Sequence, residues 1–312
     1  MKVLYLGHYR DGSGWAQSTI DYILALDSVG VDVVPRPIRL NNNKFPLPNR
    51  IIELEQKSAV GSDIVIQQTL PHLMVYDGHY KKNIGLFMTE TLNYKNTSWP
   101  DRLNQMDHLI VPNSKMKLEN EDIKTTYSVV PIPIDTSKFE QSHEPWPLGL
   151  PKGTFVFYFI SEITRRKNLE ALLRAYHTVF SQGDNVALVI KGNPPGMSPE
   201  EGQSYLANFC NDIKVGLKKY NYFGMYLPEY IITNRIPHEH LMGLHISCDC
   251  FVMPSRGEAW SLPAMDALGF GNTPIVTANT GMEDFVDNTN GYVVPSYKTP
   301  CFAANDAIKD LY

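Results

Sequence analysis

The segment Phe155–Ile190, FVFYFISEITRRKNLEALLRAYHTVFSQGDNVALVI, decides the fold of this chain. Its first six residues form an uninterrupted apolar run, which predicts a buried strand. A polar loop, SEITRRKN, follows, and then apolar residues recur at helical spacing: Leu169, Leu172, Leu173, Tyr176 and Phe180. A second apolar run, Val186–Ile190, predicts another strand. A strand, a helix and a second strand in this order are typical of a doubly wound parallel sheet.

The N-terminal half repeats this pattern. Val3–Leu6 predicts a strand, Trp15–Val29 a helix and Val31–Val34 a second strand, and further short apolar runs follow at residues 64–66, 84–88 and 109–111. Between the halves lies His143–Gly153, HEPWPLGLPKG, whose prolines and glycines favour neither helix nor strand. We therefore predict an α/β protein with two doubly wound, Rossmann-like domains facing a cleft, at residues 1–148 and 149–312.

The composition excludes several classes of protein. The 28 Lys and Arg residues are outnumbered by 33 Asp and Glu residues, so we expect no nucleic-acid partner. No apolar run is long enough to form a transmembrane segment, and the N-terminus does not resemble a signal peptide. The four cysteines lack metal-ligand spacing, and Cys248 and Cys250 lie in an apolar run where they would pack as small apolar residues. We expect a cytoplasmic enzyme.

A second segment, Ser255–Pro274, carries the strongest chemical signal. It reads SRGEAWSLPAMDALGFGNTP and follows an apolar run, Cys250–Met253, that predicts a strand. Ser261 is a good helix N-cap, and Pro263 suits the first turn of the helix that would follow. The free amides at such a helix start attract anions, and a phosphate is the natural ligand.

Two carboxylates flank this helix start. Asp266, inside the helix, could accept hydrogen bonds from a ribose diol, and Glu258, in the preceding loop, could accept them from a sugar. Arg165, Arg166 and Lys167 precede the other helix of the domain, where a bound polyanion would offset their unfavourable position. Together these groups suit a nucleotide sugar. The alternative is an ordinary capped helix with solvent-facing carboxylates and a solvated basic loop.

The first domain carries weaker candidates. Gly12, Ser13 and Gly14 lie in the loop after the first predicted strand, where glycines let the backbone approach a ligand or simply form a tight turn. The glycine spacing matches neither the dinucleotide fingerprint nor a P-loop, which argues against a dehydrogenase or a nucleoside triphosphatase. His72 and Glu90 each follow a predicted strand and could line the cleft or contact an acceptor, although a lone histidine is more often structural.

At this point the sequence resembles a known family. VMPSRGEAWSLPAMDALGFGNTPIVTANTGMEDFV is similar to the donor-site motif of the retaining family 4 glycosyltransferases (glycosyl transferases group 1), which have the GT-B fold. ITRRKNLEALLRAY resembles the family's lysine-containing loop and helix, and VVPIPIDTSKF its interdomain segment. MTETLNYKNTSWPDRLNQMDHLIVPNSKM resembles a stretch in the first domain of one subgroup. The resemblance covers most of the chain and is most specific from Pro151 to Val294.

The resemblance implies roles for individual residues. Glu258, with Gly257 and Ala259 beside it, matches the glutamate that contacts the donor sugar, and Asp266 stands where a second glutamate holds the ribose. Lys167 matches the lysine that neutralises the diphosphate, and Ser261 and Leu262 match the phosphate-binding helix start.

The chain also departs from the family pattern. The aspartate at position 266 is one methylene shorter than the family's glutamate, which puts the ribose contact in doubt. Glu162 stands where the family has an arginine, so Arg165 or Arg166 would have to replace that arginine. The family's C-terminal helix, which crosses back to the first domain, is not evident, so we expect the C-terminus to be truncated.

These observations lead to a functional expectation. The resemblance implies transfer of a sugar from a UDP- or GDP-linked donor to an acceptor hydroxyl with retention of configuration, through the catalytic candidates Glu258, Lys167 and Arg166. The acceptor would be a carbohydrate, a lipid-linked group or a protein, and we expect neither a metal nor a cofactor. The alternatives are a nucleotide-sugar epimerase or hydrolase on the same scaffold and a non-catalytic nucleotide-sugar-binding subunit.

Overall fold

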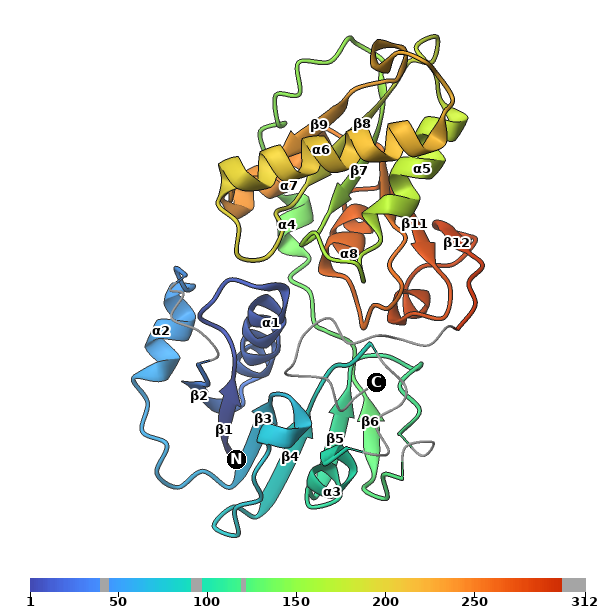
Figure 1. Ribbon diagram of the computed structural model, residues 1–312. Coiled ribbons are helices and arrows are strands. Elements are labelled where there is room, and N and C mark those ends of the chain that lie inside the picture. Colours follow the sequence, from blue (N-terminus) through green and yellow to red (C-terminus); the bar gives the residue numbers. More distant parts are fainter. Residues whose placement is uncertain (40–44, 91–96, 119–121, 299–312) are drawn as a thin grey trace. The chain divides into compact units, whose positions relative to one another are not determined.

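A computed structural model describes residues 1–39, 45–90, 97–118 and 122–298 of the chain. It divides the chain into two compact units (Figure 1), the first ending at Asp135 and the second running from Thr136 to Lys298. The expected truncation concerns residues 299–312, which lie outside the described residues. Both units are parallel α/β sheets, so the predicted fold class is confirmed.

The first compact unit ends at Asp135, before the proline-rich segment, whereas the sequence predicts a domain boundary at 148/149. The reason is that the residues after Asp135 pack against the second unit. Phe139 covers the end of its last helix, with its ring 5.0 Å from that of Phe270, and the Trp146 amide donates to the Gly243 carbonyl over 3.1 Å. A stretch that is a poor helix and a poor strand can still belong to a domain through such contacts.

The first unit is a six-stranded sheet with the order β2-β1-β3-β4-β5-β6, and all its strand pairs are parallel. Its elements are β1 (Lys2–Gly7), α1 (Gly14–Ser28), β2 (Asp32–Pro37), α2 (Asn49–Glu55), β3 (Ile64–Gln68), the 3₁₀ turn η1 (Pro71–Leu73), β4 (Lys82–Leu86), α3 (Trp99–Leu103), β5 (His108–Val111) and β6 (Tyr127–Val129). The order reverses between β1 and β3, which makes the carboxyl ends of these two strands the topological switch point of the sheet.

The second unit is also a six-stranded parallel sheet, with the order β12-β11-β10-β7-β8-β9. Its elements are α4 (Ser137–Glu140), β7 (Phe155–Ile160), α5 (Leu169–Val179), β8 (Val186–Lys191), α6 (Pro199–Leu217), η3 (Phe223–Met225), β9 (Glu229–Ile232), α7 (His238–Ile246), β10 (Cys250–Met253), α8 (Leu262–Gly269), β11 (Thr273–Thr277), η4 (Gly281–Asp284) and β12 (Tyr292–Val294). Here the switch point lies between β7 and β10, whose following loops are the two segments that carried the chemical signal in the sequence.

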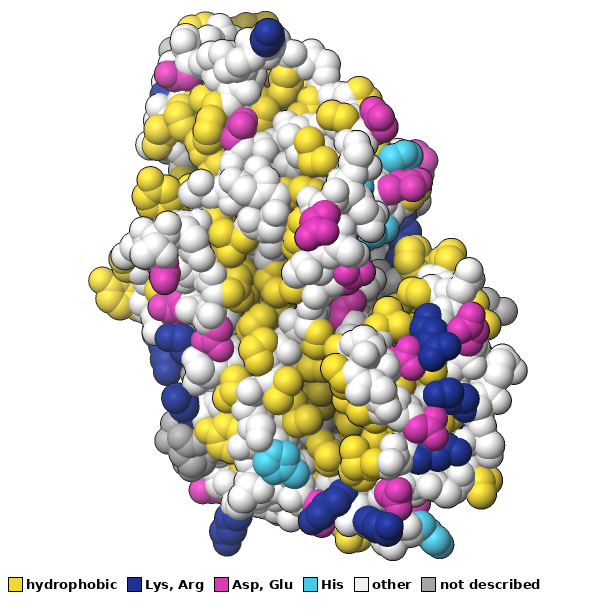
Figure 2. All heavy atoms as spheres, turned by 180° about the vertical axis from the view of Figure 1, so that it is seen from behind, with side chains coloured by type: hydrophobic (Ala, Val, Ile, Leu, Met, Phe, Trp, Pro, Cys, Tyr) yellow, Lys and Arg dark blue, Asp and Glu magenta, His cyan; other side chains and the backbone are white. Residues whose placement is uncertain are grey.

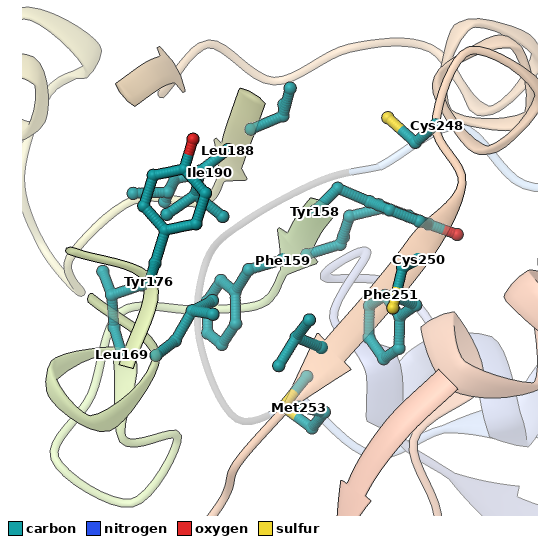
Figure 3. Packing of buried hydrophobic residues seen from close by; sticks show 14 of the residues in the cluster. Tyr158, Phe159, Leu169, Tyr176, Leu188, Ile190, Cys248, Cys250, Phe251 and Met253 are labelled. Atoms are coloured by element: carbon teal, nitrogen blue, oxygen red, sulfur yellow. The ribbon is translucent and has the colours of Figure 1, made fainter. Parts of the chain in front are cut away.

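The core of the second unit explains why β7, β8 and β10 are central. Figure 3 shows the packing of this core. Fully buried residues come from all three strands, with apolar side chains of α5 against them: Tyr158, Phe159, Leu188, Ile190, Phe251, Met253, Leu169 and Tyr176. Cys248 and Cys250 are buried free thiols in the same core, as expected from their apolar surroundings in the sequence.

The surface carries charges of both signs. On the face shown in Figure 2, Lys and Arg side chains lie among Asp and Glu side chains. Ion pairs near the surface of the first unit include Arg50 with Asp27 at 2.7 Å and Lys81 with Asp63 at 2.7 Å. Exposed pairs of this kind contribute little stability, typically below about 1 kcal/mol.

One glycine at the carboxyl edge of the second sheet has no room for a side chain. A Cβ atom on Gly192 would lie 1.9 Å from the carbonyl oxygen of Ser161, the residue that begins the loop after β7. We expect Gly192→Ala to lower the free energy of unfolding by about 2 kcal/mol, because the backbone must move. The matched control is Gly183→Ala, whose Cβ would meet no atom within 4 Å. Urea unfolding of both variants tests this, and equal stabilities would contradict it.

Candidate functional site

The two loops at the switch point of the second unit are joined by backbone and side-chain hydrogen bonds. The Arg256 amide donates to the Arg166 carbonyl over 2.7 Å, and an Arg166 guanidinium nitrogen donates to the Gly257 carbonyl over 2.8 Å. The Asn168 amide group donates to the Pro254 carbonyl over 2.9 Å. Asn168 precedes α5 with a left-handed backbone, φ 57°. The loops after β7 and β10 therefore form one surface at the crevice where sheets of this kind bind ligands.

An ion pair lies at the centre of this surface. The Lys167 ammonium contacts the Glu258 carboxylate, and their side chains are only 14% and 8% exposed. Arg166 lies 3.6 Å from the same carboxylate oxygen, whereas Arg165 is exposed to solvent. The structure therefore brings together three of the residues that the sequence singled out. It also selects Arg166 rather than Arg165 as the arginine next to Glu258, while Glu162 is exposed.

The helix start expected in Ser255–Pro274 is present. Helix α8 begins at Leu262, and its first turn is closed by the Ser261 carbonyl, which accepts from the Ala264 amide at 3.1 Å and the Met265 amide at 3.2 Å. Ser261 is the N-cap residue, but our reason for choosing it is wrong: its side chain makes no capping hydrogen bond, and its backbone is left-handed with φ 76°. Ala259 is buried beside it. Because Pro263 has no amide hydrogen and Ala264 and Met265 donate to Ser261, the Leu262 amide is the one in this first turn that has no partner within the helix.

Asp266 is held by a cation that the sequence analysis missed. It lies on α8, 7% exposed, and its carboxylate is 2.5 Å from the ammonium of Lys138 on α4. Burial raises the pKa of Asp266 above its ordinary value, although Lys138 opposes this effect. The two carboxylates of the motif thus pair with different lysines: Glu258 with Lys167, and Asp266 with Lys138. Lys138 lies in VVPIPIDTSKF, the segment compared above with the interdomain sequence, but nothing in its local pattern indicated this partner.

The candidates of the first unit follow the carboxyl ends of β1, β3 and β4. Gly12, with φ 68°, precedes Ser13, whose hydroxyl caps α1 by accepting from the Ala16 amide over 3.1 Å, and Gly14 is the first residue of that helix. His72 is exposed and stacks on Trp99 with ring centroids 6.5 Å apart. Glu90 is exposed in the chain beyond β4.

A different histidine, His8, joins the two switch-point loops of this unit. It is 2% exposed, and its ring nitrogens lie 2.9 Å from the Thr69 hydroxyl and 3.0 Å from the Ile38 carbonyl. Burial lowers the pKa of His8 below its ordinary value of 6.5, which favours the neutral ring, while the hydrogen bond to Ile38 opposes this effect. In the sequence, His8 lies shortly after the first predicted strand, and this position could have marked it as a candidate site residue.

Among residues 1–39, 45–90, 97–118 and 122–298, no group of three or more His, Cys, Asp or Glu side chains is arranged to hold a metal ion. Within these same ranges, no helix combines the length and apolarity needed to cross a membrane.

Comparison with solved structures identifies the class of fold. Sucrose-phosphate synthase from Thermosynechococcus elongatus superimposes with a TM-score of 0.64 at 16% identity, covering 95% of this chain and 86% of that one. The structure described as trehalose-6-phosphate from E. coli bound with UDP-2-fluoro glucose gives 0.65 at 12% identity, covering 95% and 88%. Anabaena Alr3699/HepE in complex with UDP-glucose gives 0.63 at 15% identity, covering 95% and 85%. The chain therefore has the two-domain GT-B fold.

Sequence comparison identifies the family. The profile of the glycosyl transferases group 1 matches residues 140–311, more than half of the chain, and the chain belongs to this family. Alpha-monoglucosyldiacylglycerol synthase of Streptococcus pneumoniae is 22% identical over 60% of this chain and 41% of its own length. Glycogen synthase 1 of Geobacter metallireducens is 29% identical over 45% of this chain and 24% of its own length. The matches thus span less than half the length of these curated relatives.

Proposed function

We propose that this chain transfers a sugar from a nucleoside-diphosphate sugar to an acceptor hydroxyl, with retention of the anomeric configuration. The observation that carries the proposal is the partly buried Lys167–Glu258 pair beside Arg166, in the loops before α5 and α8 at the switch point of the second sheet. On this one surface, cations and helix amides are available to a diphosphate. A carboxylate on the same surface is available to sugar hydroxyls. The family membership and the sugar-nucleotide complexes of its structural neighbours support the same conclusion.

In this mechanism the charged side chains Lys167 and Glu258 change partners when the donor binds. The donor diphosphate takes Lys167 away from Glu258 and also contacts Arg166 and the amides at Ser261 and Leu262. Glu258, with Gly257 and Ala259 on either side, then accepts hydrogen bonds from the donor sugar. When the glycosidic bond to the diphosphate breaks, negative charge grows on the leaving oxygen, and these preorganised groups stabilise it. Asp266 would receive the ribose, which requires a hydroxyl to share or replace its contact with Lys138.

The family relation supports the proposal of retention, and no individual residue carries it. Attack by the acceptor on the same face that the diphosphate leaves, with the leaving phosphate as the base, needs no nucleophilic side chain from the protein. The loop at Gly12–Gly14, His72 and Glu90 are the first-unit candidates for acceptor contacts. A carbohydrate, a lipid-linked group or a protein could supply the acceptor hydroxyl.

The test is ligand binding followed by turnover. Thermal unfolding with UDP, GDP, ADP, UDP-glucose and GDP-mannose, with and without EDTA, is expected to show one nucleoside diphosphate that raises the midpoint by several degrees. A ligand at about 100 times its Kd stabilises the folded state by about 2.7 kcal/mol. If none of these compounds changes the midpoint under either condition, the donor-site assignment is wrong.

Turnover then separates the proposal from its two rivals. A glycosyltransferase consumes the sugar nucleotide faster when a suitable acceptor is added. An epimerase or hydrolase consumes it at the same rate without an acceptor, and a non-catalytic subunit binds it but leaves it intact across the acceptor panel.

A further inference from the structure

Asn168 is the N-cap residue of α5, but its side chain does not cap that helix. An asparagine at an N-cap normally has an extended backbone, and its side chain accepts a hydrogen bond from an amide of the first turn. The Asn168 backbone is instead left-handed, with φ 57° and ψ 40°, and its side chain makes no capping hydrogen bond. The start of α5 therefore does not explain why an asparagine stands at this position.

Both ends of the Asn168 amide group bind the loop after β10. Its nitrogen donates to the Pro254 carbonyl over 2.9 Å, and its oxygen accepts from a guanidinium nitrogen of Arg256 over 3.1 Å. Glycine has no side chain for such contacts, and an ionised aspartate has no donor. Asparagine also tolerates a left-handed backbone better than most residues with a side chain. Asparagine thus combines the properties that this position uses.

Lys167, the cation in contact with Glu258, lies between two residues that bind the same loop. On one side Arg166 donates to the Gly257 carbonyl over 2.8 Å, and on the other side Asn168 makes the contacts just described. These bonds fix the backbone of Lys167 relative to the loop that carries Glu258. A charge that is held in place before the substrate arrives can stabilise a developing negative charge without reorganising during the reaction.

We infer that Asn168 is a positioning residue, which acts on catalysis by keeping the loop of Lys167 and the loop of Glu258 at a fixed separation. The inference rests on the proposed function, in which Asn168 itself contacts neither donor nor acceptor. Without the Asn168 side chain the ammonium of Lys167 is still present, but the two loops can move apart. A displacement of about 1 Å in a catalytic group can slow a reaction by about a hundredfold.

Asn168→Gly removes the side chain without straining the backbone, since glycine readily adopts a left-handed conformation. We expect this variant to transfer sugar about tenfold more slowly, because Arg166 still holds one side of the loop. Its unfolding midpoint is expected to stay within a few degrees of the wild type, since relief of the backbone offsets part of the lost hydrogen bonding. Asn168→Asp keeps the bond from Arg256 and loses only the donor to Pro254. It is expected to show a smaller loss of the same kind, and it provides the test if Asn168→Gly does not fold.

The decisive measurement is a double-variant cycle between Asn168 and Lys167. If Asn168 acts through Lys167, Asn168→Gly slows transfer in the wild type but has no further effect in Lys167→Met, where no charge is left to position. A residue that served only the fold would slow transfer by the same factor in both backgrounds. Transfer rates at saturating donor, measured for the wild type, the two single variants and the double variant, give the coupling.

Two control variants reproduce the two parts of the change elsewhere in the second unit. Lys218→Gly relaxes another left-handed backbone, at the exposed C-cap residue of α6 with φ 51°. Asn185→Ala removes another asparagine that joins two loops, just before β7 and β8: its side chain donates to the Gly153 carbonyl over 2.9 Å and accepts from the Thr154 hydroxyl over 3.0 Å. Both variants are expected to transfer sugar at the wild-type rate.

The possible results separate this inference from the proposed function. A tenfold loss that disappears in Lys167→Met, with both controls unchanged, supports the inference. A wild-type rate in Asn168→Gly, or equal losses in the two backgrounds, overturns the inference and leaves the proposed transfer intact. If the wild type neither binds a nucleoside diphosphate nor transfers a sugar, the proposed function fails and this inference fails with it.

Discussion

Replacing Lys167 by methionine is expected to lower the rate of sugar transfer by at least about a hundredfold, which is the usual effect of removing one group that stabilises a developing negative charge. Lys167 is the cation in direct contact with Glu258 and is only 14% exposed, so its charge acts where water screens it poorly. Methionine keeps much of the apolar stem and removes only the charge. We also expect weaker binding of the nucleoside diphosphate.

The structure offers a matched control for this variant. Lys81 pairs with Asp63 in the first unit, but the Lys81 side chain is 80% exposed, and Lys81→Met is expected to leave transfer unchanged. Steady-state rates with the donor identified by binding, together with circular dichroism to show that the variants fold, provide the measurement. A Lys167→Met protein that folds and keeps its rate within threefold of the wild type would disprove the assigned role.

The second large effect concerns stability rather than chemistry. Lys138→Met is expected to lower the free energy of unfolding at pH 7 by about 3 kcal/mol, because it leaves the buried Asp266 carboxylate without its partner. The control is Lys57→Met, which breaks an ion pair with Asp32 whose side chains are 36% and 50% exposed. That variant is expected to lose less than about 1 kcal/mol. Urea unfolding of both variants provides the comparison.

The pH dependence of the Lys138→Met variant has a definite sign. Burial raises the pKa of Asp266 above the ordinary value of 3.8, so the folded state keeps a proton that the unfolded state has already lost. Stability therefore falls as the pH rises from about 4 through the raised pKa. Without Lys138 the pKa of Asp266 rises further, so the loss of stability with rising pH continues to a higher pH.

We therefore expect the deficit of Lys138→Met relative to the wild type to be smallest in acid, where Asp266 is protonated, and to grow toward neutral pH. Adding Asp266→Asn to this variant removes the charge and should recover much of the loss. A deficit that is the same at all pH values, or no recovery in the double variant, would show that the ion pair is not its cause.

These two lysines differ in how much the sequence revealed about them. Lys167 was identified because it lies at a predicted helix start, and Glu258 because it lies in the loop before another. Their contact joins residues 91 positions apart, yet both positions were predictable because each follows a strand of one parallel sheet. Lys138 and Asp266 are 128 positions apart, and Lys138 had no local feature that pointed to a carboxylate.

The sequence alone determined β7 and β10, because each is a continuous and largely buried apolar run in the middle of its sheet. Phe155–Ile160 and Cys250–Met253 were predicted with the bounds that the structure has. The sequence analysis missed β6, β9 and β12, which are edge strands. Their residues are mostly half-buried or exposed, so these strands need no continuous apolar run. Tertiary structure decided three other features: the boundary at Asp135, the partner of Asp266 and the left-handed backbone of Ser261. Each of these depends on contacts between elements, and hydrophobic periodicity records only which residues of one element are buried.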